Sequence, residues 1–267
     1  MRRTAPVTGN REPGTNLMRI RLQKLLRDAG FGSRRHSEEF IVARRVKING
    51  RVVEHLGMTV DPDVDKITVD GKPLRRGPEH VRYILFHKPD GVASASGDRF
   101  GRRTVFDILP REFLKFFMAG RLDYHTTGLM FFTNDGEFAQ MLAHPRFGIE
   151  KIYSAKVTGT PDERKLESIA RGPVVAGERC QPVGVRIVEH SPKGNLWLEL
   201  TLREGKKNQI RIMFDQIGHP VQKLKRLSIG PFKLRSLQPG EYRELSARDV
   251  ARIKERMILE SRSMSTR

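Results

Sequence analysis

Cysteine is nearly absent from this 267-residue chain, because Cys180 is the only one. A single cysteine excludes an intrachain disulfide and a cysteine-cluster metal site, and it suits a reducing compartment. No apolar run approaches the roughly 18 residues that a membrane-spanning helix needs, so a transmembrane protein is excluded. Arg2 and Arg3 are not followed by the apolar segment of a signal peptide. Together these absences predict a cytoplasmic protein.

Several motifs of common enzymes are also missing. The sequence contains no glycine-rich phosphate loop and no HExxH, GxSxG or CxxC pattern. It therefore offers no support for nucleotide hydrolysis, zinc proteolysis or serine-esterase chemistry. The histidines are scattered singly, and His144 before Pro145 is more typical of a turn than of a metal ligand. We expect no metal site and no cofactor.

Charge is what the chain has in excess. Lys and Arg number 50 against 31 Asp and Glu, which gives a formal net charge of +19. Such a charge does not determine the fold, but it favours a polyanionic partner, with nucleic acid first and an anionic membrane surface second. Apolar residues make up 37% of the chain, which is compatible with one or two globular domains.

Composition shifts and breaker residues predict the domain organisation. Short helices and strands occur in mixed order with strands predominating, which indicates the α+β class. Translation can begin at Met1 or at Met18, and both remain open. The expected segments are a disordered basic arm (1–17), a small first unit (18–76), a linker (77–80), a larger second unit (81–246), and a charged C-terminal helix and tail (247–267).

The first unit combines two short helices with a small β-ribbon. Asn49-Gly50 and Asp70-Gly71 are strong signals for two-residue hairpin turns. Basic residues bracket the second helix and predict a face that follows phosphates, although a solvated helix surface would show the same pattern. These residues are Arg34, Arg35, Arg44 and Arg45.

Among the carboxylates of the second unit, Asp123 has an unusual setting. It lies in AGRLDYHTTGLMFFTNDG, a glycine-bounded turn that leads into an apolar strand. An acid beside Arg121 can be a simple ion pair. It can also be a nucleophilic or basic carboxylate that a nearby cation keeps ionised. The spacing alone leaves both interpretations open.

Two resemblances cover nearly the whole chain outside its tails, about residues 18–246. RLQKLLRDAGFGSRRHSEEFIVARRVKINGRVV resembles an S4 RNA-binding domain along its full length. GRLDYHTTGLMFFTNDG resembles the catalytic motif of RNA pseudouridine synthases of the RsuA type. HPRFGIEKIYSAKVTG, LREGKKNQIRIMF and PGEYREL continue that match in the family's order. The resemblance implies a mixed, largely antiparallel sheet flanked by helices.

The resemblance also implies roles for individual residues. Asp123 matches the catalytic aspartate, Tyr153 the tyrosine that stacks on the target base, and Arg211 the basic residue that pairs with the aspartate. Arg121 matches a phosphate or base-extrusion contact, and Leu200 is expected to supply an apolar wall. The basic residues expected to hold RNA phosphates are Lys206, Lys207, Lys223, Lys225 and Arg226. The sequence departs from the family pattern at His87, Asn208 and Ile212.

The implied reaction converts uridine to pseudouridine and needs no cofactor or metal. Asp123 either attacks C1′ or removes the 2′-proton, and the sequence is compatible with both routes. The expected partner is ribosomal RNA or a pre-ribosomal particle. We expect the protein to act as a monomer and not to bind a membrane. A catalytically silent RNA-binding or ribosome-assembly factor is the alternative. A DNA-binding regulator lacks support, because no helix-turn-helix with base-reading side chains occurs.

Overall fold

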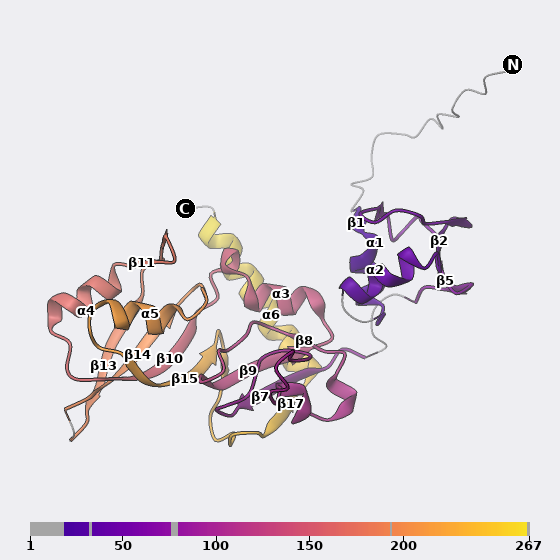
Figure 1. Ribbon diagram of the computed structural model, residues 1–267. Helices are drawn as coiled ribbons and strands as arrows, with labels where there is room; N and C mark the ends of the chain where they lie inside the picture. Colours follow the sequence, from indigo (N-terminus) through magenta and orange to yellow (C-terminus); the bar gives the residue numbers. More distant parts are fainter. Residues whose placement is uncertain (1–18, 32–33, 76–79, 193, 266–267) are drawn as a thin grey trace, which may run out of the picture. The chain divides into compact units, whose positions relative to one another are not determined.

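A computed structural model describes residues 19–31, 34–75, 80–192 and 194–265 (Figure 1). The chain divides into two compact units, Met1–Gly77 and Pro78–Arg267. The predicted basic arm at 1–17 lies outside the described residues, as do residues 77–79 of the predicted linker. No helix in the described ranges is long and apolar enough to cross a membrane.

The first unit packs two helices against short strands. Its elements are β1 (Ile20–Arg21), α1 (Leu22–Asp28), α2 (Arg34–Val42), β2 (Val46–Ile48), β3 (Arg51–Val52), β4 (Thr59–Val60), β5 (Ile67–Val69) and β6 (Lys72–Pro73). Strands pair in the orders β1-β4 and β3-β2-β5-β6. Leu22, Leu26 and Ile41 form the centre of its core, while Val42, the last residue of α2, is 68% exposed.

Both predicted hairpin turns of this unit are confirmed. Asn49 and Gly50 have φ of 52° and 82°, and Asp70 and Gly71 have φ of 51° and 76°. Left-handed conformations at both turn residues define the turn type that matches the twist of paired strands, and Asn, Asp and Gly tolerate it best. These turns connect β2 to β3 and β5 to β6.

A single sheet organises the second unit. Its strands run in the order β13-β14-β10-β15-β9-β7-β17, with β16 beside β15 and β8 beside β9. All neighbours are antiparallel except β15 and β9, so the predicted α+β class with a largely antiparallel sheet is confirmed. The strands are β7 (Tyr83–Lys88), β8 (Phe117–Met118), β9 (Thr127–Thr133), β10 (Lys151–Val157), β13 (Gly184–His190), β14 (Leu196–Leu202), β15 (Val221–Ile229), β16 (Phe232–Lys233) and β17 (Tyr242–Leu245).

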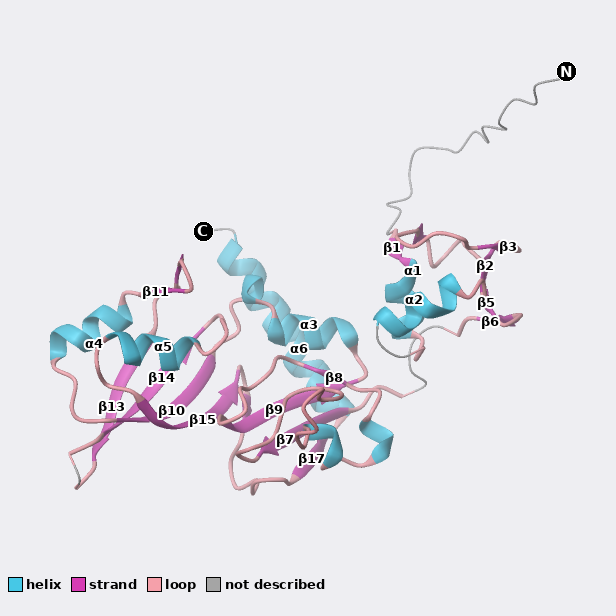
Figure 2. Ribbon diagram, in the orientation of Figure 1, coloured by secondary structure: helices cyan, strands magenta, loops and turns pink. Residues whose placement is uncertain are grey.

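Helices cover opposite faces of the two halves of this sheet. Figure 2 shows α4 (Glu163–Ala170) and α5 (Gln209–Gln216) along one side of β13, β14, β10 and β15. In the other half, α3 (Gly136–Ala143) and α6 (Ala247–Ser265) pack against Leu129 and Phe131 of β9. Met130 and Phe132 of the same strand point the other way, into the core that α5 shares.

Short helical turns and one small hairpin complete the second unit. Its described residues include the 3-10 turns η1 (Val105–Asp107), η2 (Arg111–Phe113) and η3 (Pro145–Phe147), and β11 (Val174–Val175) pairs with β12 (Glu178–Arg179). Asp135 caps α3, since its carboxylate accepts a hydrogen bond from the Phe138 amide at 2.9 Å.

Replacing Gly128 by alanine should lower the free energy of unfolding by about 3 kcal/mol or more. Gly128 has φ +110°, and an added Cβ would lie 2.3 Å from the carbonyl oxygen of Arg226. The only parallel strand pair in the described sheet, β9 with β15, forms at this point, where Gly128 faces Arg226. Urea denaturation monitored by circular dichroism measures the loss.

Gly97→Ala is the matched control for this substitution. No atom lies within 4 Å of a Cβ added at Gly97, and its φ lies outside the left-handed range. An equal loss of stability in both variants would contradict a specific close approach at Gly128.

Candidate active site

A cavity of about 730 Å³ opens beside the N-terminal end of α5. Its lining comes from the turn at 120–124, from β10, and from the loop and helix start at 204–210. Among the residues predicted from sequence, the cavity brings together Arg121, Asp123, Tyr153, Lys206 and Lys207. Segments far apart in the chain therefore place a carboxylate, an aromatic ring and three basic side chains around one hollow.

The backbone on both sides of Asp123 is held by hydrogen bonds. The Ser94 hydroxyl donates to the Leu122 carbonyl at 2.8 Å, and the Leu122 amide donates back to that hydroxyl oxygen at 3.2 Å. On the other side, the Thr126 amide donates to the Asp123 carbonyl at 3.0 Å. Leu122 is buried whereas Asp123 is partly exposed, so the turn presents the carboxylate to the cavity.

Lys88 supports the turn that carries Asp123 through hydrogen bonds to backbone carbonyls. Its Nζ donates to the carbonyls of Tyr124 at 3.0 Å, Thr126 at 2.9 Å and Pro89 at 3.0 Å. The side chain is fully buried, and burial lowers the pKa of Lys88 to about 8, against the opposing effect of the negative charges of Asp90 and Asp123. Three ammonium hydrogens thus meet three carbonyls, two of which belong to the turn that carries Asp123.

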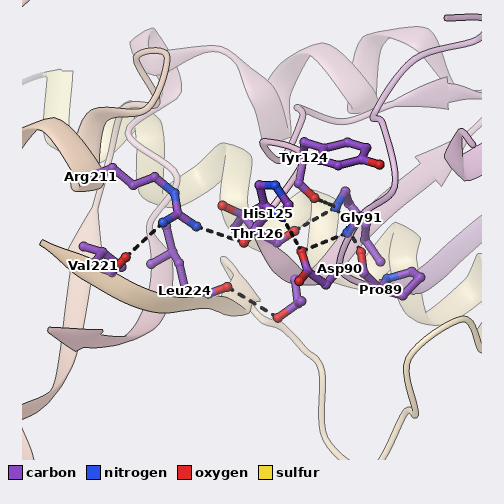
Figure 3. A network of polar contacts seen from close by, with 11 residues as sticks. Pro89, Asp90, Gly91, Tyr124, His125, Thr126, Arg211, Val221 and Leu224 are labelled. Carbon is purple, nitrogen blue, oxygen red and sulfur yellow. Dashed lines mark hydrogen bonds and ion pairs between the residues drawn. The ribbon is translucent and has the colours of Figure 1, made fainter. Parts of the chain in front are cut away.

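Arg211 braces the same turn from α5, and here the structure corrects a prediction. Its guanidinium donates to the carbonyls of His125 at 2.9 Å and Val221 at 3.1 Å (Figure 3). Among the described residues no ion pair joins Arg211 to Asp123, because two backbone carbonyls lie nearer to its donors. His125 is also held by Asp90, whose carboxylate lies 3.1 Å from Nδ1. The arginine ties α5 and β15 to the turn.

Tyr153 forms the apolar side of the cavity. It is 8% exposed, and its neighbours across the sheet are Leu200 on β14 and Arg226 on β15. Leu200 is fully buried and is not among the lining residues, so it packs beside the tyrosine strand and does not form the cavity wall that was predicted. The ring of Tyr153 itself borders the space that Asp123 faces.

The predicted phosphate contacts separate into two groups. Lys206 and Lys207 line the cavity, and Lys206 also lies 3.0 Å from Glu178. Lys223 and Lys225 flank Leu224, which lines the cavity, so strand alternation directs both lysines to the opposite face of the sheet. Neither lysine can contact an RNA segment held inside the cavity.

Arg226 corrects the prediction further. Its side chain is 2% exposed, and Nε donates to the Leu129 carbonyl at 2.7 Å. The prediction of a phosphate contact is wrong for this residue, because its side chain is buried and bonded to the backbone of β9.

The basic residues of the first unit are only partly described. Arg45 forms a two-bond ion pair with Asp70, with distances of 2.8 and 2.6 Å, and Arg44 lies 3.3 Å from Glu54. All four of these side chains are substantially exposed. The side chains of Arg34 and Arg35 lie outside the described residues.

Glu204 and Gln209 hold the cavity loop and were missed by sequence reasoning. Gln209 Nε2 donates to Glu204 at 2.8 Å, and the Gln181 amide donates to the same carboxylate at 3.0 Å. Gln209 Oε1 accepts from the Lys206 amide at 2.9 Å. Glu204 is 8% exposed, so this pair fixes the backbone that presents Lys206 and Lys207. A buried acid and amide five residues apart give no local signal in the sequence.

The three departures from the family pattern have structural roles. Asn208 adopts φ +52° before α5, a left-handed conformation that asparagine tolerates well. Ile212 packs against the core, and His87 is buried with Nδ1 2.7 Å from the Leu237 carbonyl. Asn208 lines the cavity, whereas His87 and Ile212 do not. Within the described ranges, no group of three or more His, Cys, Asp or Glu side chains could hold a metal ion.

Comparisons with known proteins identify two families along the chain. Residues 82–216 match the model of the RNA pseudouridylate synthase family, and residues 20–66 match the S4 domain. The chain is 41% identical to "Ribosomal large subunit pseudouridine synthase B" of Bacillus subtilis, over 88% of this chain and 95% of that one. It is 40% identical to "Uncharacterized RNA pseudouridine synthase" of Aquifex aeolicus, over 89% of this chain and 94% of that one.

A solved structure supports the same relationship. The chain in "Crystal structure of pseudouridylate synthase" is 28% identical, with a TM-score of 0.62. The match covers 87% of this chain and 98% of that chain. The likeness therefore extends through both units and is not limited to the catalytic motif.

Proposed function

The chain belongs to the RNA pseudouridylate synthase family and carries an S4 domain, and we propose that it isomerises a uridine of ribosomal RNA with Asp123 as the catalytic carboxylate. The observation that carries this proposal is the placement of Asp123 beside Tyr153 in one cavity. The name of the Bacillus subtilis relative favours large-subunit RNA as the substrate.

The reaction needs one carboxylate at C1′ and room for a free base. The bond from C1′ to N1 breaks, uracil turns, and C1′ bonds to C5. The C5 proton leaves and N1 takes up a proton, so no atoms or electrons are gained or lost overall. Asp123 attacks C1′ or removes the 2′-proton, and its position at the cavity supports either route. Lys88 and Arg211 keep the turn in place while the base moves.

The target uridine must leave its stack to enter this cavity. Extrusion costs a few kcal/mol and costs least for a base in a loop. Stacking on Tyr153 returns about 1–3 kcal/mol. Arg121, Lys206 and Lys207 lie around the same space and supply positive charge for the flanking phosphates. Arg102 also lines the cavity, and its guanidinium carbon lies 5.1 Å from the centre of the Tyr124 ring.

Mapping pseudouridines tests the proposed function. Ribosomal RNA from the wild-type and deletion strains is treated with carbodiimide and read by reverse transcription. One pseudouridine stop should vanish in the deletion strain, and the purified protein should restore it on the isolated RNA. A silent RNA-binding factor would bind the RNA and leave every stop unchanged, which would contradict the proposal.

Deleting residues 1–77 should weaken RNA binding and flatten its dependence on salt. Each phosphate contact contributes about 0.7–0.9 to the slope of log affinity against log salt concentration, and three or four contacts from the S4 unit would remove roughly 2–4 units. The second unit has its own hydrophobic cores, so it should stay folded. Filter binding over a salt series measures the slope, and circular dichroism checks the fold. An unchanged slope would mean that the S4 unit does not hold phosphates.

A further inference from the structure

The sheet of the second unit has a second face that the proposed chemistry does not use. Pairing registers place Lys223, Lys156 and Trp197 side by side across β15, β10 and β14. The next row contains Lys225, Ser154 and Glu199, followed by Arg186 on β13. We call the side chains of Lys156, Trp197, Lys223 and Lys225 the open basic face.

This face points away from the cavity. Side chains alternate along a strand, and Tyr153, Ala155 and Leu224 lie on the side of the sheet that faces the core shared with α5. Lys156, Lys223 and Lys225 occupy the intervening positions. In the described part of the chain, Figure 2 shows α4 and α5 on the cavity side and no helix over the other side of β13 and β14.

The open basic face carries an excess of positive charge, although Glu189 of β13 is the cross-strand neighbour of Trp197. Within the described ranges, none of its three lysines forms an ion pair with a carboxylate, whereas Glu199 is already taken by Arg186 at 2.9 Å. Lys156 Nζ lies 5.9 Å from the centre of the Trp197 ring. Unpaired ammonium groups bind the phosphodiester backbone of nucleic acid, and a partly exposed indole ring stacks on a base.

A groove extends this face toward α6. A cavity of about 400 Å³ lies beside Ile152 and Ser228, the next cross-strand pair along β10 and β15. Arg256 also lines it, Arg203 lies there paired with Glu150 at 2.8 Å, and the buried Ser228 hydroxyl has no hydrogen-bond partner. Arg248, Arg252 and Arg256 recur every fourth residue of α6, so they share one side of the helix and are all exposed. Positive charge thus continues from the sheet onto the helix.

We propose that the open basic face binds a second segment of RNA through its phosphates, on the side of the sheet opposite the cavity. The proposal rests on the proposed function, since it gives the RNA substrate a second contact. RNA fits this face better than a lipid surface does, because membrane insertion needs protruding apolar side chains and Trp197 is only partly exposed.

The sole tryptophan of the chain lies on this face and reports on it directly. An oligouridylate of about 30 nucleotides, titrated into the full-length protein, should quench the fluorescence of Trp197. The triple variant Lys156→Gln, Lys223→Gln, Lys225→Gln should lose this quenching. Its slope of log affinity against log salt should fall by about 2–3 units, because each lost phosphate contact removes about 0.7–0.9. The matching Lys→Arg triple variant should retain both signals.

A matched control removes the same charge elsewhere. Arg111→Gln, Lys115→Gln, Arg164→Gln changes three exposed residues on other elements and should leave quenching and slope near wild type. Equal slope losses in both Gln triples would overturn the proposal, as would an unquenched wild-type Trp197. Binding to phosphatidylserine vesicles is measured in parallel. A Lys→Gln triple variant that loses vesicle binding but keeps RNA binding would also overturn the proposal. Pseudouridine formation by the wild type is scored separately, so failure of the proposed function remains distinguishable.

Discussion

Replacing Asp123 by asparagine should abolish pseudouridine formation while RNA binding stays within about twofold of wild type. An amide neither attacks C1′ nor takes the 2′-proton, and loss of a nucleophile or base costs about a thousandfold or more. Asparagine has the same size, and Asp123 is partly exposed, so the fold should tolerate the substitution. Single-turnover release of tritium from 5-tritiated uridine in RNA measures the rate.

Asp90→Asn is the matched control for this experiment. Asp90 is a more exposed carboxylate near the same turn, where it contacts His125 and the Gly91 amide. Its replacement should reduce turnover by less than about tenfold, because it can only loosen the turn. A rate for Asp123→Asn within tenfold of wild type would contradict the assignment of the catalytic carboxylate.

Local chemistry made much of the fold predictable. The two hairpins of the first unit follow from Asn49-Gly50 and Asp70-Gly71, since few other pairs adopt left-handed conformations at low cost. The cap at Asp135 follows from an acid directly before the apolar stretch of α3. Each of these features depends on residues within a few positions of one another, which is the range over which sequence patterns carry information.

Features that depend on distant strands were not predictable in the same way. The sequence predicts one basic cluster from Lys223, Lys225 and Arg226. In the folded sheet, the alternation of side chains turns the two lysines away from the cavity, and Arg226 is buried beside β9. Bulges in the pairing of β10 with β15 shift the register further. The cavity loop depends likewise on Glu204, whose partners Gln181 and Gln209 become neighbours only in the folded sheet.

Lys88→Met should slow catalysis by about a hundredfold and lower the free energy of unfolding by about 1 kcal/mol at pH 7. The variant leaves the carbonyls of Tyr124 and Thr126 without their donor, so the turn that carries Asp123 loses its support. Methionine fills nearly the same volume, so the effect comes from the lost hydrogen bonds and charge. Lys115→Met changes an exposed lysine and should leave both quantities unchanged. Tritium release and urea denaturation provide the two measurements.

The pH dependence of stability distinguishes a buried ammonium from an ordinary surface lysine. Burial lowers the pKa of Lys88 to about 8 in the folded protein, against 10.5 for an unperturbed lysine. Between these values the unfolded chain holds the proton and the folded chain does not, so the free energy of unfolding rises with pH. The slope approaches about 1.4 kcal/mol per pH unit.

Lys88→Met lacks this contribution, while Lys151 and Tyr83, whose pKa values are also shifted by burial, contribute equally to both proteins. The stability difference between wild type and variant should therefore widen by about 2 kcal/mol from pH 8 to pH 10. A difference that stays constant over this range would mean that the ammonium of Lys88 is not buried beneath the turn.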